Sequence, residues 1–175
     1  VGVELQDGLY GRACRNIEVN GLTGRVEFLH KDLKDLPRVM PAEGFDMVVM
    51  NPPFRRPGTG KISPGDERAA ARHELTAGIA DIARTASIML RNGGRFCVVY
   101  HPARLAELFS ELKKRKLEPK RMRTIHSHAG DEARIVLVEA VKSGLTGFKV
   151  LPPLFIYRSL NEYTPEMREF YGLPS

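Results

Sequence analysis

Short apolar segments alternate with helical patterns along most of this sequence, and that alternation restricts the fold more than any other feature. The segments expected to form strands are Val1–Leu5, Arg25–Leu33, Phe45–Met50 and Arg95–Tyr100. The segments expected to form helices are Asp7–Asn20, Ala69–Leu90 and Pro102–Lys116. Apolar strands separated by helices are typical of a largely parallel sheet that is covered on both faces. The sequence therefore predicts an α/β fold.

Two further strand patterns, Lys120–Ser127 and Arg134–Lys142, follow one another with no helical pattern between them. Strands joined by a short loop pair antiparallel, so we expect an antiparallel hairpin at one edge of the sheet. Thr164 and Pro165 combine a capping hydroxyl with proline at the first helical position, which predicts a last short helix. We expect residues 1–150 to form one domain, and residues 151–175 to form a C-terminal tail that packs on the same domain.

The composition is that of a basic globular domain. Of the 175 residues, 42% are hydrophobic, and the 27 Lys and Arg residues exceed the 21 Asp and Glu residues, giving a formal net charge of +6. A basic balance favours contact with nucleic acid or anionic lipid, although a basic protein without such a partner has the same composition. Cys14 and Cys97 have no CxxC neighbour, so we expect no metal site but two reduced core thiols in a cytoplasmic protein. No apolar run approaches the roughly 20 residues of a membrane span.

Three polar side chains follow strand patterns at their carboxyl ends, where open α/β sheets bind their ligands. Glu4 can accept hydrogen bonds from the two hydroxyls of a ribose, as a carboxylate does in dinucleotide-binding folds. Asp32 can accept a hydrogen bond from an adenine amino group. Acidic residues at strand ends are also often only solvated, but these two, in strand order, indicate a nucleoside cofactor. The third polar residue is Asn51.

The stretch from Asn51 to Phe54, Asn-Pro-Pro-Phe, is the sharpest signal. Proline restricts the residue before it to extended conformations, so Asn51 and Pro52 are both held extended. The Pro52 carbonyl then points into a cleft beside the Asn51 side-chain oxygen, and the two acceptors hold the hydrogens of a planar NH₂ group. Phe54 stacks on the ring that carries this amine, a contact of roughly 1–3 kcal/mol. The simpler alternative is a strand ended by a turn.

These residues resemble the class I S-adenosylmethionine-dependent methyltransferases, and among them the amino methyltransferases that carry Asn-Pro-Pro-Phe. The similarity is greatest to the bacterial tRNA1(Val) adenine-N6 methyltransferases, on the segments ARHE (71–74), PPLFIY (152–157) and NEYTPE (161–166). The resemblance implies a Rossmann-like sheet and S-adenosyl-L-methionine as cofactor. It also implies that Glu4, Asp32 and Asn51 bind the cofactor, and that the tetrapeptide with Pro53 at its centre forms the catalytic site for a target amine, most simply adenine N6 in tRNA.

The chain departs from this family at its start. It begins at Val1, inside a strand pattern, and lacks the family's first strand and the glycine-rich loop that follows it. The resemblance places that strand between the strands that end at Glu4 and Asn51. We therefore expect an N-terminally truncated fragment that is inactive by itself. Closure of the two flanking strands onto each other, or strand exchange within a homodimer, would compensate for the missing strand.

An RNA substrate would need a basic surface beside the pocket. Arg55, Arg56 and Lys61 lie in a Gly- and Pro-rich stretch directly after the tetrapeptide, and we expect them to contact RNA. A second basic cluster comprises Lys113 to Lys116 with Lys120, Arg121 and Arg123. Two other functions remain open: methylation of guanine N2 in rRNA or of a protein glutamine N5, and a non-catalytic RNA-binding module on the same fold.

Overall fold

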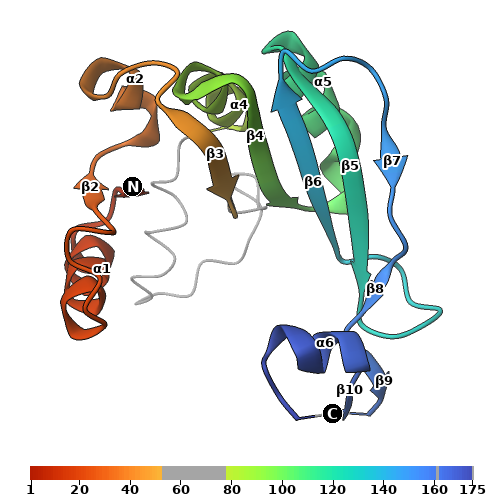
Figure 1. Ribbon diagram of the computed structural model, residues 1–175. Helices are drawn as coiled ribbons and strands as arrows, with labels where there is room; N and C mark the ends of the chain where they lie inside the picture. The colour runs from red at the N-terminus through yellow and green to blue at the C-terminus, as the bar shows by residue number, and fades with distance from the viewer. Residues whose placement is uncertain (53–77, 161, 175) are drawn as a thin grey trace, which may run out of the picture.

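The computed structural model describes residues 1–52, 78–160 and 162–174 (Figure 1). The helices are α1 (Asp7–Val19), α2 (Leu36–Val39), α4 (Ile79–Met89), α5 (Leu105–Lys114) and α6 (Pro165–Phe170), with short 3-10 turns at Leu33–Asp35 and Pro102–Arg104. The longer strands are β3 (Phe45–Met50), β4 (Leu90–Tyr100), β5 (Leu117–His126) and β6 (Ile135–Lys142). The short strands are β1 (Gly2–Glu4), β2 (Phe28–His30), β7 (Lys149–Val150), β8 (Leu154–Phe155), β9 (Tyr157–Ser159) and β10 (Glu162–Tyr163).

The strands form one large sheet and two small ones. The six-stranded sheet has the order β3-β4-β6-β5-β7, with β8 also paired to β5, whereas β1 and β2 form a separate parallel pair. Within the large sheet β3 and β4 are parallel, and β6 runs antiparallel to both β4 and β5. This arrangement confirms the predicted α/β fold and its antiparallel strand pair.

The core lies between the large sheet and helices α4 and α5. Alternate residues of β4, namely Phe96, Val98 and Tyr100, are at most 2% exposed, as expected for one face of a pleated strand. Leu108 and Leu112 of α5, spaced four apart, are fully buried against them. The helix expected within Pro102–Lys116 is therefore confirmed, and its apolar residues form a buried face.

The opposite face of the sheet is different. Met47 is 39% exposed, Val49 is 70% exposed and Leu137 is 37% exposed. Val49 lies between half-buried residues of β3, and Leu137 lies between buried residues of β6. Cover by helices on both faces was expected, but the described helices cover the large sheet on one face only, since α1 packs on β1 and β2.

Some predicted boundaries are wrong. The strand expected at Arg95–Tyr100 begins five residues earlier, at Leu90, so Asn92-Gly93-Gly94 lie inside β4 rather than between a helix and a strand. The reason is local packing: a Cβ on Gly94 would lie 2.8 Å from the Arg91 carbonyl oxygen and 3.2 Å from that of Phe45. Glycine at this position lets β3 and β4 approach where their register shifts.

Two other expectations need correction. The second strand is only Phe28–His30, because Asp32 caps a 3-10 turn that diverts the chain. Both cysteines are free but only half-buried rather than core thiols. Cys97 faces Glu139 on the open side of the sheet, and desolvation together with that carboxylate raises the pKa of its thiol.

The C-terminal segment forms a small unit below the end of β5 (Figure 1). The Thr164 hydroxyl accepts a hydrogen bond from the Met167 N–H at 3.3 Å, and Pro165 opens α6. The last short helix and its cap are therefore as predicted. No helix in the described part of the chain is long and apolar enough to cross a membrane.

Candidate active site

A cleft of about 410 Å³ lies between the β1–β2 pair and the β3 edge of the large sheet. Its lining includes Glu4, Asp32, Asn51 and Pro52. These residues are far apart in the sequence, and each follows or ends a strand. The structure therefore brings together at one cleft all the candidate site residues that it describes.

The strand pairings explain why these residues meet. The parallel pairing of β1 with β2 aligns Glu4 with His30, so Asp32 lies just beyond the same end of the pair. Asn51 directly follows β3, whose parallel partner β4 lies on the side away from the cleft. β1 and β3 belong to different sheets and are not paired with each other. The two flanking strands have thus not closed onto each other.

Glu4 and Asp32 also have local structural roles. Glu4 Oε1 accepts a hydrogen bond from the Gln6 N–H at 2.8 Å, just before α1 begins. Asp32 Oδ1 accepts one from the Lys34 N–H at 2.9 Å, and its Oδ2 lies 3.3 Å from the Lys34 ammonium. An ionised carboxylate has about four acceptor sites, so these contacts fix each side chain and leave acceptor capacity for a ligand.

The Asn-Pro step lies at the wall of the cleft. Asn51 is exposed and Pro52 is buried, so the chain turns from solvent into the protein within two residues. Pro53, Phe54 and the expected RNA contacts Arg55, Arg56 and Lys61 lie outside the described residues.

The residues at the floor of the cleft were not among those predicted from the sequence. Apolar side chains from α2 and α4 line it, and so do Lys31 and Thr85, the latter only 7% exposed. The apolar lining residues of these helices are Leu36, Ile82, Ala86 and Met89. The periodicity of α4 predicted a buried face, but it did not distinguish residues facing the sheet from residues facing a cleft. Lys31 had a usable signal, since it directly precedes Asp32.

Most of the second basic cluster makes local ion pairs. Lys113 lies 2.7 Å from Glu118 and Lys114 lies 2.6 Å from Glu111. These two lysines end α5, just before β5 begins, whereas the cleft is at the carboxyl ends of the parallel strands. Lys113 to Lys116 therefore lie at the opposite end of the strands from Asn51, and only Arg123 of this cluster lies near the carboxyl end of β5.

The described histidines have structural contacts. His101 Nδ1 accepts a hydrogen bond from the Ala103 N–H at 3.2 Å and caps a 3-10 turn. His126 contacts the Thr124 hydroxyl and the Asp131 carbonyl oxygen, and His128 contacts the Asp131 carboxylate. Within the described residues, no group of three or more His, Cys, Asp or Glu side chains is placed to hold a metal ion.

Several solved structures with a similar fold are methyltransferases. One is a predicted O-methyltransferase, protein Atu636 from Agrobacterium tumefaciens, with a TM-score of 0.76 and 21% identity over 97% of this chain and 75% of that chain. TrmN from Thermus thermophilus gives a TM-score of 0.52 and 22% identity, over 80% of this chain and 35% of that one. Geranyl diphosphate C-methyltransferase from Streptomyces coelicolor, solved with S-adenosyl-L-homocysteine, gives a TM-score of 0.57 and 12% identity, over 81% of this chain and 61% of that one.

These similarities establish the fold. The chain has the Rossmann-like fold of class I methyltransferases, with its cleft at the carboxyl ends of the strands. At these levels of identity the neighbours' substrates do not transfer to this chain. No family model and no curated protein matches the sequence.

Proposed function

We propose that this chain belongs to an S-adenosylmethionine-dependent N-methyltransferase acting on the exocyclic amine of a nucleic-acid base, most specifically adenine N6 in tRNA. One observation carries the proposal: Glu4, Asp32 and Asn51 line a single cleft although long stretches of sequence separate them. The carboxylates suit a nucleoside, and the amide suits a target amine. The TrmN neighbour adds support at the level of fold.

The described residues fit the nucleoside part of the cofactor. Glu4 would hold the ribose hydroxyls and Asp32 the adenine amine, while the apolar floor from α4 would pack against the adenine ring. The thin polar rim over an apolar floor is typical of small-molecule sites. Bound S-adenosylmethionine supplies an electrophilic methyl group on a sulfonium.

Asn51 and Pro52 would position the amine. The Asn51 side-chain oxygen and the Pro52 carbonyl oxygen would accept its two hydrogens and so orient the nitrogen lone pair. Such positioning, together with placed dipoles, supplies most of the acceleration in reactions between bound partners. No general base is required of the chain, because the amine becomes acidic once it is alkylated.

The nucleic acid would have to present its base out of the stack, at a cost of a few kcal/mol that is lowest in a loop. The net charge of +6 favours an anionic substrate such as a nucleic acid. Arg55, Arg56 and Lys61 would contact its phosphates, and Phe54 would stack on the base. These assignments depend on the sequence pattern, since the four residues lie outside the described part of the chain.

The test is Asn51→Ala in the full-length protein. We expect turnover to fall by about 10²–10³, the usual loss for one placed polar group in an active site. The Kd of S-adenosylmethionine should change much less, because Glu4 and Asp32 would make the main contacts to the cofactor. Asn16→Ala is the matched control, because Asn16 is an exposed asparagine on α1. Methyl transfer should be assayed on tRNA, rRNA and a release factor. Full activity of Asn51→Ala on every substrate would overturn the proposal, and transfer only to rRNA or protein would move it to the guanine-N2 or glutamine-N5 class.

A further inference from the structure

Four aromatic rings in and beside the C-terminal segment form a continuous ladder. The His128 and Tyr157 ring centroids are 5.5 Å apart, those of Tyr157 and Tyr163 are 5.3 Å apart, and those of Tyr163 and Tyr171 are 5.3 Å apart. The central pair is almost parallel, with 12° between the ring planes. Stacked rings at this separation have favourable offset geometry. The two outer pairs are tilted, by 32° for His128 and Tyr157 and by 39° for Tyr163 and Tyr171, so the ladder turns gradually toward its outer end at Tyr171.

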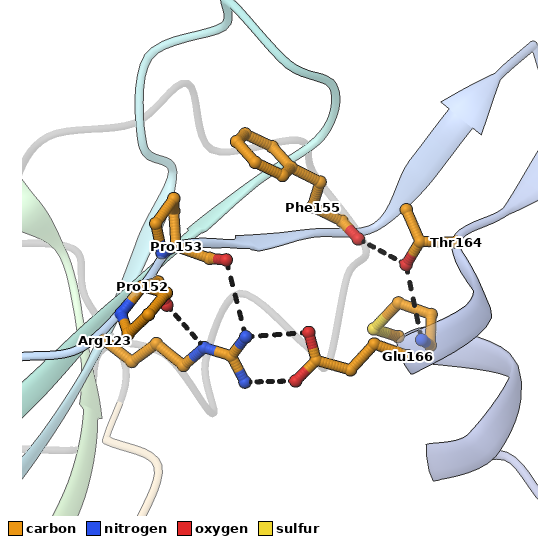
Figure 2. A network of polar contacts seen from close by, with 7 residues as sticks. Arg123, Pro152, Pro153, Phe155, Thr164 and Glu166 are labelled. Atoms are coloured by element: carbon orange, nitrogen blue, oxygen red, sulfur yellow. Dashed lines mark hydrogen bonds and ion pairs between the residues drawn. The ribbon is translucent and has the colours of Figure 1, made fainter.

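Polar contacts hold the ladder on the sheet. The Arg123 guanidinium makes two hydrogen bonds to the Glu166 carboxylate, at 2.5 and 2.8 Å, and its Nε donates to the Pro152 carbonyl oxygen at 2.9 Å (Figure 2). The Thr164 hydroxyl donates to the Phe155 carbonyl oxygen at 2.7 Å while it caps α6 (Figure 2). A bidentate pair fixes orientation as well as distance, so α6 and the rings beside it are tied to β5.

The ladder lies at the same end of the parallel strands as Asn51. β3 is parallel to β4, and β5 has the same direction as β4 because both are antiparallel to β6. The carboxyl ends of β3 and β5 therefore lie on the same side of the sheet. β8 pairs with that end of β5, and the chain runs on from β8 into the ladder. β5 is three strand positions from β3, which corresponds to about 14 Å across the sheet.

The outer end of the ladder is open and apolar. Tyr171 is 60% exposed, and the neighbouring Phe170 and Leu173 are 64% and 43% exposed. The cations close by are engaged: Arg158 pairs with Glu162, and Arg168 donates to the Pro174 carbonyl oxygen. The surface thus offers rings rather than positive charge, and a ligand would be held there by stacking.

We propose that this ladder is a stacking platform for an unpaired base of the single-stranded nucleic acid, several nucleotides along the strand from the base that enters the cleft. The proposal rests on the proposed function, and it adds where the substrate is held. An unpaired base would continue the stack on Tyr171. Stacking on aromatic side chains tolerates any base, because every base has a flat face.

The test measures binding of a fluorescein-labelled single-stranded RNA of mixed sequence to the full-length protein, by anisotropy, without any methyl donor. Tyr171→Ala should weaken binding about 5- to 100-fold, the range expected for one lost stack. The slope of log affinity against log salt concentration should stay that of the wild type, because no phosphate contact is lost. Tyr171→Phe, which keeps the ring, should bind like the wild type. Tyr171→Leu keeps an apolar group without a planar face and should bind like the alanine variant.

Leu145→Ala is the matched control, since Leu145 is an apolar residue 85% exposed after β6, at the opposite edge of the sheet. Wild-type affinity in both Tyr171→Ala and Tyr171→Leu would overturn the proposal. So would a change in oligomeric mass with unchanged RNA affinity, which would make the ladder a protein-docking surface. Because binding is measured without methyl transfer, loss of affinity in Tyr171→Ala would stand even if Asn51→Ala kept full activity, and the two failures are distinguishable.

Discussion

The two walls of the cleft are built in opposite ways. β3 has no buried residue of its own, but it is paired along its length with β4, which helices cover and in which Phe96 and Leu90 are fully buried. The other wall consists of β1, β2 and α1, and not one residue of these three elements is buried. The proposed amine site therefore lies on the better packed support, and the proposed cofactor site lies on the less well packed one.

The unequal packing has a physical meaning for the site. A region with few buried apolar contacts opens locally at a lower free energy than the core does. Glu4 and Asp32 therefore lie on the wall that opens more readily, and Asn51 lies at the end of the better packed one. A ligand that contacts both walls would stabilise the weaker wall by mass action.

The largest expected difference between the two walls is in the free energy of unfolding, and it is tested by truncating one apolar side chain in the strands of each wall. Phe96→Ala should lower the free energy of unfolding by about 3–5 kcal/mol, as expected for a large buried side chain. Leu29→Ala, in β2, should cost much less because Leu29 is only half-buried. Urea denaturation of both variants measures the difference. An equal loss in the two variants would show that β2 is part of the same cooperative core.

A second test adds a methyl group to a glycine in each region. Gly94→Ala should cost about 1–3 kcal/mol, because the new Cβ would lie 2.8 Å from a backbone carbonyl oxygen that the sheet holds in place. In Gly2→Ala the Cβ would meet the Phe28 ring instead, at 2.4 Å. That ring is half-buried and can rotate away, so the loss should be smaller. Thermal unfolding of the two variants would contradict the comparison if Gly2→Ala were the more destabilised.

The smallest effect concerns the C-terminal unit, which is held by ion pairs rather than by buried apolar groups. Hydrogen bonds from Arg158 and Ser159 lower the pKa of Glu162 from 4.5 to about 2, and hydrogen bonds from Arg123 lower the pKa of Glu166. A depressed folded-state pKa stabilises the structure fully above the unfolded value of 4.5, and this stabilisation is lost as the pH falls toward 2.

Acid should therefore loosen the C-terminal unit before the large sheet. We expect the near-ultraviolet circular dichroism of its stacked tyrosines to change between about pH 4.5 and 2 while the far-ultraviolet signal of the sheet persists. Arg158→Ala should move this change to higher pH, because Glu162 then regains a more ordinary pKa. Coincident loss of both signals in the wild type would show that the ion pairs do not hold the unit separately.

Much of the fold followed from local patterns. The α4 and α5 faces were predictable because apolar residues recur at helical spacing, and α6 was predictable because Thr164 and Pro165 form a local cap. Strand ends were less predictable. Asn92-Gly93-Gly94 has the composition of a helix stop, and only the approach of β3 at Gly94 makes it part of a strand. The order of the strands depends on contacts distant in sequence, which periodicity does not contain.

The candidate site was predictable where chemistry and strand ends coincide. Glu4, Asp32 and Asn51 were identified as polar residues that follow apolar strands, and the structure brings them to one cleft. Lys31 was missed although it directly precedes Asp32, whereas Thr85 was missed because a single polar residue in a helix has no distinctive spacing. The aromatic ladder was missed for the same reason, since its rings come from separate short elements that only the fold aligns.

The position of β6 in the sheet has a consequence for synthesis of the chain. β5 ends at His126, but its main partner β6, which also joins it to β4, is complete only at Lys142, about 16 residues later. At a translation rate of about 5–20 residues per second, synthesis of β6 is complete about 1–3 s after that of β5. During that interval β4 also has an unpaired edge, since β6 is its neighbour on that side. A nascent chain that has emerged only as far as Ser127 would therefore expose unpaired edges on both β4 and β5, and this is the stage at which we expect its demand for chaperones to be greatest.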